Sequence, residues 1–306
     1  SSFTPLLDGR SLLLGSDMGS NQREIAKFSE RDAEAFPRYE ALLERVAAVL
    51  EPTLCKSAPD PLPLPKAWRK IGMGKRMRDA KKLFDAYQAV CGLEEDLPEA
   101  VELLTGAARP ILDRWFDAEV LKATLATDAV IGAFSSISAP GTAYVLLHHV
   151  MGTAGGARGV WGYVQGGMGG LADALEATCD ELRVDIRREA SVTKILTRQG
   201  RATGVLLESG TQLNANVVAS SVDAHLTFEK FLDVEDLPED FRKGISRIDY
   251  SSASAKINVA LSELPQFTCA RSSGIAAHHR GTIHLSPTMD YIEKAFDDAK
   301  YGRPSR

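Results

Sequence analysis

The chain has 306 residues, of which 44% are hydrophobic and 25% are charged, an ordinary globular composition sufficient for one large domain or two smaller ones. Its 36 basic and 41 acidic side chains give a net charge of -5, so it lacks the broad positive field with which nucleic-acid-binding proteins attract phosphates. The four cysteines form no C-x-x-C pair, and no stretch reaches the roughly 20 apolar residues of a membrane-spanning helix. We therefore expect no nucleic acid partner, no cysteine zinc site and no spanning segment.

The first third of the chain is predicted to be helical. Ser29 followed by Asp32 resembles a capping box. Apolar residues then recur at helical spacing: Phe36, Leu43, Val46 and Leu50. The prolines of residues 59–65 fix their own backbone torsions, which predicts a connector at which this helix stops.

A second helical region is predicted over residues 81–134. Pro98 and Pro110 suit the first turns of helices, where a missing N–H costs nothing. Asp117 is the expected cap of the segment that carries Leu121 and Leu125.

Beyond residue 152 glycine becomes frequent, and the pattern changes to mixed helix and strand. A helix is predicted over residues 171–182. Three runs rich in β-branched residues follow and predict a β-meander, with turns at Gln199-Gly200 and Ser209-Gly210: residues 191–197, 203–207 and 212–219. Further on, residues 237–245 indicate a helix, and residues 255–261 and 282–286 indicate strands.

Residues 167–172 match the dinucleotide fingerprint G-x-G-x-x-A, in which the free N–H groups of a helix start bind a pyrophosphate. The fingerprint normally follows a buried strand, whereas residues 160–165 are short and half polar. Two interpretations stay open: a phosphate site, or a glycine turn that lets the next helix pack closely.

The segment around this turn resembles the corresponding segment of phytoene desaturases and related flavin amine-oxidase-like proteins. Six stretches carry the resemblance: residues 121–133, 144–152, 161–175, 190–195, 204–207 and 256–260. It implies an α+β fold, namely the substrate domain of an FAD-dependent oxidoreductase, helical with a mixed sheet, plus part of an α/β Rossmann-like FAD domain. The implied division is a mostly helical substrate domain over 1–182, strands returning to the FAD-binding domain over 183–225, and a second substrate-domain part over 226–306.

The resemblance also implies roles for individual residues. Val192 matches the position whose backbone N–H and C=O contact the adenine of FAD, and Gly166 and Gly167 match a close-packing turn beside the junction of flavin and substrate. Trp161, Tyr163 and Gln165 are candidates for lining the substrate cavity; the alternative is a loop that aromatic side chains anchor in the core. No catalytic base is predicted, since flavin enzymes leave the redox step to the cofactor.

The family's N-terminal glycine fingerprint and C-terminal glycine-rich flavin segment have no counterpart in these residues, and both ends of the sequence look like cuts. We therefore expect FAD to be the cofactor of a complete protein and this chain alone to bind it poorly.

No metal is expected at the histidines. His148 and His149 are adjacent on a predicted helix and point about 100° apart. His278, His279 and His284 have no acid-rich neighbourhood to complete a ligand set.

Residues 66–82 are strongly basic, with apolar side chains interleaved and Asp79 as the only acid. The basic residues are Lys66, Arg69, Lys70, Lys75, Arg76, Arg78, Lys81 and Lys82. This pattern fits either a solvated helix face or a surface helix that makes a peripheral contact with an anionic membrane.

The resemblance implies a dehydrogenase-like or desaturase-like oxidoreductase that transfers hydride from a hydrophobic small-molecule substrate to FAD. It further implies the mitochondrial matrix, or the cytoplasm in a bacterium, and association with a cytochrome c oxidase subunit that bears on mitochondrial function. The alternative is a flavin-free binding or scaffold protein on the same fold, as in the GDP-dissociation inhibitors.

Overall fold

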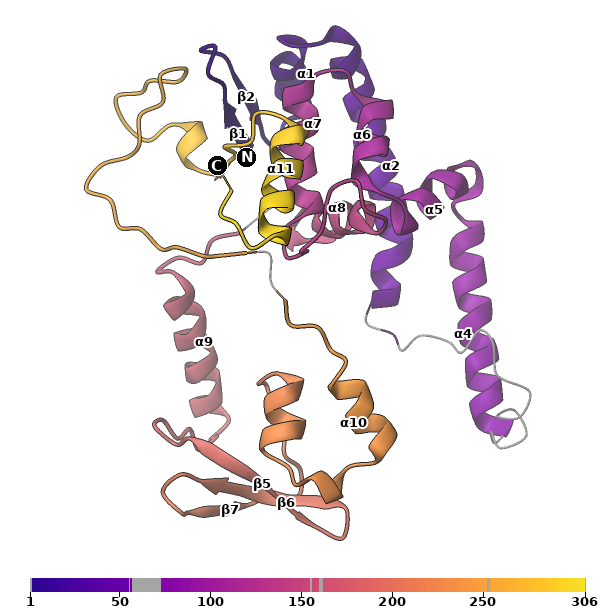
Figure 1. The fold of residues 1–306 in the computed structure, drawn as a ribbon, viewed down its shortest axis with the longest axis vertical. Coiled ribbons are helices and arrows are strands. Elements are labelled where there is room, and N and C mark those ends of the chain that lie inside the picture. The colour runs from indigo at the N-terminus through magenta and orange to yellow at the C-terminus, as the bar shows by residue number, and fades with distance from the viewer. Residues whose placement is uncertain are drawn as a thin grey trace. The chain divides into compact units, whose positions relative to one another are not determined.

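The computed structural model describes residues 2–54, 56, 73–154, 156–159, 162–251 and 254–305. The chain divides into two compact units, Ser1–Gly162 with Ser252–Arg306, and Tyr163–Ser251. Figure 1 labels the elements of both. The proline connector expected at residues 59–65 lies outside the described residues. The smaller unit contains helices as well as the predicted strands; the expected assignment of residues 183–225 to an FAD-binding domain stays a prediction.

The larger unit is mostly helical (Figure 1). Its α-helices are α1 (Met18–Ala26), α2 (Glu30–Leu54), α4 (Met73–Cys91), α5 (Leu97–Thr105), α6 (Ala108–Trp115), α7 (Glu119–Ala126), α8 (Thr142–Met151) and α11 (Met289–Lys300). Pro98 and Pro110 lie in the first turns of α5 and α6, as predicted.

A small mixed sheet lies in the same unit. Strand β1 (Ser2–Pro5) pairs antiparallel with β2 (Ser11–Leu14) and parallel with β8 (Thr282–Ile283), so the strand order is β2-β1-β8. A two-residue pair, β3 (Thr153–Ala154) and β4 (Ala157–Arg158), completes the strands described in this unit. Helices with small sheets confirm the predicted α+β class.

The hydrophobic core belongs to the larger unit. Phe36, Leu43 and Val46 of α2 are buried, as their helical spacing predicts, and they pack in one cluster with residues of α6, α7 and α8. Pro37 lies inside α2 and has no N–H to donate to the carbonyl of Ala33, four residues earlier; the Gln22 side-chain amide donates to that carbonyl instead, at 3.0 Å.

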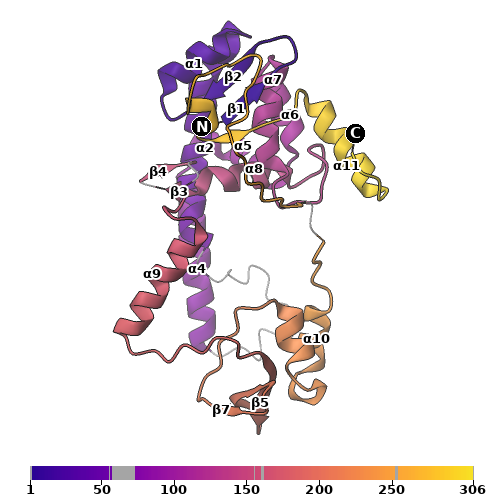
Figure 2. The same ribbon diagram turned by 90° about the vertical axis from the view of Figure 1, so that its left-hand side faces the viewer.

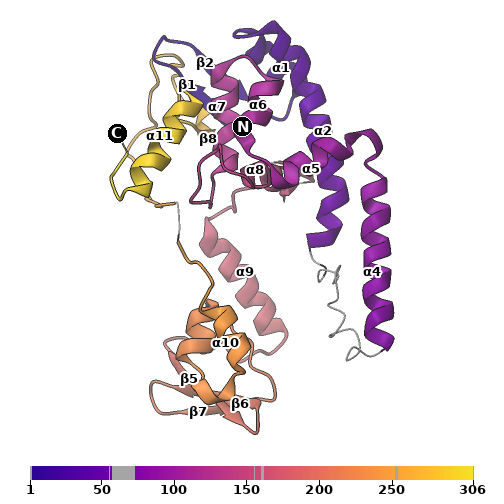
Figure 3. The ribbon, with the colours of Figure 1, turned by 45° about the vertical axis from the view of Figure 1, so that its right-hand side comes forward.

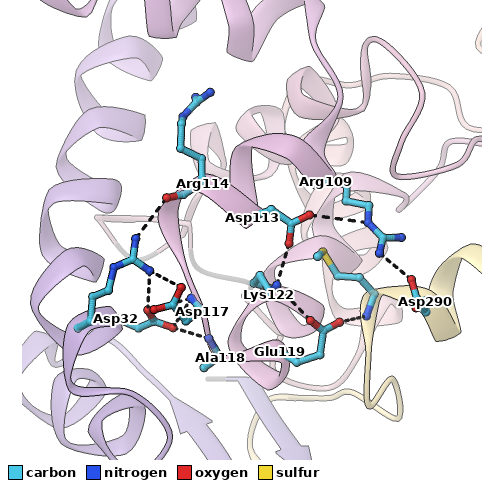
Figure 4. Close-up of polar contacts among 11 residues, drawn as sticks. Asp32, Arg109, Asp113, Arg114, Asp117, Ala118, Glu119, Lys122 and Asp290 are labelled. Carbon is cyan, nitrogen blue, oxygen red and sulfur yellow. Dashed lines mark hydrogen bonds and ion pairs between the residues drawn. The ribbon is translucent and has the colours of Figure 1, made fainter.

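Asp32 has a different partner from the one predicted. Ser29 does cap α2, since its Oγ accepts the Asp32 N–H at 3.2 Å, but the Asp32 carboxylate turns away to α7. There it accepts the backbone N–H groups of Asp117 at 3.0 Å and Ala118 at 2.7 Å (Figure 4). The cap expected from Asp117 is therefore wrong: a buried carboxylate from α2, 85 residues earlier, satisfies the start of α7.

Tyr39 has a buried hydroxyl. The side chain is 1% exposed and packs edge-on against Trp115 and Phe116, while its Oη has no hydrogen-bond partner among the described residues. Burial raises the pKa of this phenol, because the charged form cannot be solvated there.

We therefore expect Tyr39→Phe to stabilise the chain by about 1 kcal/mol, since it removes an unpaired buried polar group and keeps the ring packing. The midpoint of urea unfolding measures this change. Trp115→Phe is the comparison: it replaces a packed indole with a smaller ring, removes no buried hydroxyl and should destabilise the chain. A lower midpoint for Tyr39→Phe would mean that the hydroxyl has a partner.

The smaller unit carries helix α9 (Met168–Glu181), a three-stranded antiparallel sheet and helix α10 (Glu239–Ile245) (Figure 2). The strands are β5 (Val192–Arg198), β6 (Arg201–Leu207) and β7 (Gln212–Asn214), in the order β5-β6-β7. The predicted meander is confirmed, with Gln199 and Gly200 at positive φ in its first turn, as hairpin turns require. Its third strand ends at Asn214 and not at residue 219.

The strand predicted over residues 255–261 is wrong. Ile257 and Val259 are 82% and 70% exposed, and residues 254–261 form no regular element. Alternating apolar residues form a strand only beside a partner strand, and no described segment pairs with these residues. The strand predicted at 282–286 is confirmed only at β8.

Candidate functional site

Glycine shapes the turn that leads into α9. Gly166 and Gly167 have φ of +81° and +78°, a conformation that side-chain-bearing residues rarely adopt. A Cβ at Gly170 would lie 2.7 Å from the Gln165 carbonyl oxygen, whereas a Cβ at Gly166 or Gly167 would meet nothing within 4 Å among the described residues. Gly170 is therefore the glycine of this turn that packs closely on the chain itself, and the role of Gly166 and Gly167 beside the flavin stays a prediction.

The residues before α9 do not form the strand that a dinucleotide fingerprint needs. Residues 162–167 are turns and irregular backbone. Residues 167–172 therefore do not fit a pyrophosphate cradle, and the glycine turn is the better interpretation.

The candidates for the substrate cavity are only partly described. Trp161 lies outside the described residues. Tyr163 is 79% exposed and Gln165 is exposed, so neither side chain is anchored in the core of the smaller unit. A role for all three in lining a substrate cavity stays a prediction.

Val192 is the first residue of β5, at one edge of the three-stranded sheet. It lies opposite Leu207, whose N–H donates to Thr211 on the far side of β6, while the next residue, Glu208, donates to the Ser191 carbonyl. Backbone groups of successive strand residues point to opposite sides. The N–H and C=O of Val192 are therefore turned away from β6, toward the open edge of the sheet.

The strand beyond Val192 is held in place. A bulge separates Val192 from Lys194, and the Ile195 N–H then donates to the Phe231 carbonyl at 2.7 Å on the outer edge. The Ile195 side chain is buried. An edge strand with a fixed backbone and outward-facing N–H and C=O groups fits the edge of an adenine ring, which offers one donor and one acceptor.

A cavity of about 420 Å³ opens in the smaller unit beside β5 and β6. Its walls are mostly apolar, with Thr197 donating to the Asp236 carboxylate at 2.8 Å. The principal apolar residues are Ile195, Val218, Val222, Phe228, Leu232 and Leu237. No local sequence motif predicts this cavity, because its walls come from β5, from the start of β6 and from residues 218–237.

The histidines serve packing. His284 is buried, and its Nδ1 lies 3.1 Å from the Thr127 hydroxyl; burial lowers its pKa. His278 packs on Phe3. Within the described residues no three histidine, cysteine or acidic side chains gather as a metal site would require, and no helix is long and apolar enough to cross a membrane.

Comparison with known proteins agrees with the motifs. The chain is 42% identical over 319 residues to rat (Rattus norvegicus) pyridine nucleotide-disulfide oxidoreductase domain-containing protein 2, an alignment that covers 100% of this chain and 54% of the relative. The mouse (Mus musculus) protein of that name is also 42% identical, over 318 residues. A hydroxyneurosporene desaturase of Cereibacter sphaeroides is 28% identical over 226 residues, which is 71% of this chain and 38% of the relative.

The chain thus spans about half the length of the rat and mouse relatives that it matches throughout. The model of one protein family, described as flavin containing amine oxidoreductase, matches residues 16–268, which include the whole smaller unit and most of the larger one. Together with the desaturase similarity, this match confirms the predicted resemblance: the chain belongs to the flavin-containing amine oxidoreductase family.

Proposed function

We propose that this chain is part of an FAD-dependent oxidoreductase that removes hydride from a hydrophobic substrate. The family match supports flavin as the cofactor, and the similarity to a protein named as a desaturase supports a reaction that removes hydrogen. When bound, the flavin would accept the hydride. The residues of this chain would position the cofactor and shield the reacting carbon from water.

One observation carries the proposal most directly. The backbone N–H and C=O of Val192 face the open edge of β5, as an adenine contact requires, and the bulge and the Ile195 hydrogen bond fix that backbone. The pyrophosphate does not fit residues 167–172, so we do not assign it to α9. The mitochondrial matrix and association with a cytochrome c oxidase subunit stay predictions of the resemblance.

The test is flavin retention by the full-length protein, measured as the ratio of visible flavin absorbance to protein absorbance. We expect Val192→Pro to lower flavin affinity about tenfold, because proline removes one N–H that would bind adenine. Proline is tolerated in the first residue of an edge strand. Val192→Ile keeps the N–H and is the matched control.

Unchanged flavin content in a folded Val192→Pro protein would contradict the adenine contact. A full-length protein that is folded and colourless would contradict the oxidoreductase itself and favour a flavin-free binding protein on the same fold. The two outcomes differ, since the first concerns the variant and the second the unmodified protein.

A further inference from the structure

Helix α4 exposes a continuous apolar face. Met77 is 69% exposed, Phe84 57% and Tyr87 67%, and these residues recur at helical spacing on one side. Leu83 and Val90, 37% and 41% exposed, widen the same face. The helix stands at the edge of the larger unit (Figure 3) and contacts mainly α2, and the exposed fractions of these side chains mean that the larger unit leaves this face uncovered.

The charge of α4 is opposite to that of the rest of the chain. Helix α4 contains five basic and two acidic residues, whereas the whole chain has a net charge of -5; the start of the basic stretch, residues 66–72, lies outside the described residues. Of the described basic side chains, Arg78 and Lys81 are exposed and form no ion pair with any described residue. They project from the helix beside the apolar face and would meet an anionic surface together with it.

Helix α9 provides a contrast within the same molecule. It too exposes apolar side chains, with Leu171 and Leu175 at 43% and 61%, and none of its residues is buried. Its charged residues are all acidic: Asp173, Glu176, Asp180 and Glu181. An apolar face with acidic neighbours suits a protein partner, whereas an apolar face with basic neighbours suits lipid with anionic headgroups.

We propose that α4 lies in the surface of an anionic lipid membrane, with Met77, Phe84 and Tyr87 among the acyl chains and Arg78 and Lys81 at the headgroups. This contact would be peripheral: the helix lies along the surface. It is independent of the adenine contact at Val192, since the two regions belong to different compact units.

Vesicle flotation of the 306-residue chain tests the proposal. We expect it to float with vesicles of phosphatidylcholine containing about one fifth phosphatidylglycerol and to remain behind with phosphatidylcholine alone. Arg78→Gln combined with Lys81→Gln should lower the partition coefficient about 30-fold, since each basic residue near an anionic surface adds to the free energy of membrane binding. Met77→Ser combined with Phe84→Ser should lower it at least about tenfold.

Leu171→Ser combined with Leu175→Ser is the matched control, because it removes a similar apolar area from the acidic helix; it should leave flotation unchanged. Equal losses from the α4 and α9 variants would overturn the proposal, as would equal flotation with both kinds of vesicle or none with either. A change of oligomeric mass in the α4 variants, with no lipid binding by the unmodified chain, would instead identify the face as a protein contact.

Discussion

Asp32→Ala is expected to lower the free energy of unfolding by about 3 kcal/mol. The carboxylate is fully buried and accepts the N–H groups of Asp117 and Ala118 at the start of α7. Alanine would leave both donors unpaired in the interior and would remove a negative charge from the positive end of a helix dipole. Thermal unfolding followed by circular dichroism should show a midpoint lower by roughly 10 °C.

Two control variants separate capping from simple loss of charge. Asp32→Asn keeps an acceptor oxygen and should lose about half as much stability. Asp117→Ala removes the side chain that the sequence suggests as the cap; because that side chain is 65% exposed and forms a surface ion pair with Arg31, little change is expected. If Asp117→Ala destabilised the chain as much as Asp32→Ala, the assignment of the cap to Asp32 would be wrong.

Asp32 also shows where prediction from sequence ends. The period of Phe36, Leu43 and Val46 predicts α2 and its buried face, because helical spacing is a local property. The hydrogen bonds of Asp32 join residues 85 and 86 positions apart. Local pattern gives the Ser29 cap correctly and the partner of Asp32 wrongly, since a carboxylate near a helix start can serve its own helix or another one.

In the candidate site, too, local features could be predicted from the sequence, whereas features that depend on distant residues could not. The meander and its turns are local and were predicted, but the outward direction of the Val192 backbone depends on the bulge and on the Thr211 and Ser191 hydrogen bonds. The cavity beside β5 depends on residues 218–237 folding back over the sheet. The strand predicted at 255–261 has the alternating apolar pattern of a strand, but no described segment pairs with it. The pattern of a single segment does not reveal whether a partner strand lies beside it.

Gly204→Ala is expected to separate β7 from β6. Gly204 has φ of +153°, and a Cβ there would lie 2.1 Å from the Leu213 carbonyl oxygen and 3.0 Å from Asn214 Cα. Since these are backbone atoms of the paired strand, the clash can be relieved only if the strands move apart. We estimate a local cost of about 3 kcal/mol from overpacking and backbone strain together.

Amide hydrogen exchange measures this effect residue by residue, so it shows which strand pairing is lost. Protection should fall about 100-fold for residues that pair β6 with β7, which corresponds to about 3 kcal/mol. Gly210→Ala is the control: Gly210 also has positive φ, +83°, but nothing lies within 4 Å of its added Cβ, so only the smaller torsional cost of about 1 kcal/mol applies.

The pattern of lost protection also bears on the site. Because β6 lies between β7 and β5, two responses are possible: β7 alone loosens, or the whole sheet does. We expect β7 alone, since its pairing is short, whereas β5 and β6 pair along their whole length and bury Ile195 and Leu207. In that case the backbone at Val192 keeps its direction and flavin retention by the full-length protein is unchanged. Loss of protection in β5 as well would mean that the adenine-facing edge depends on all three strands.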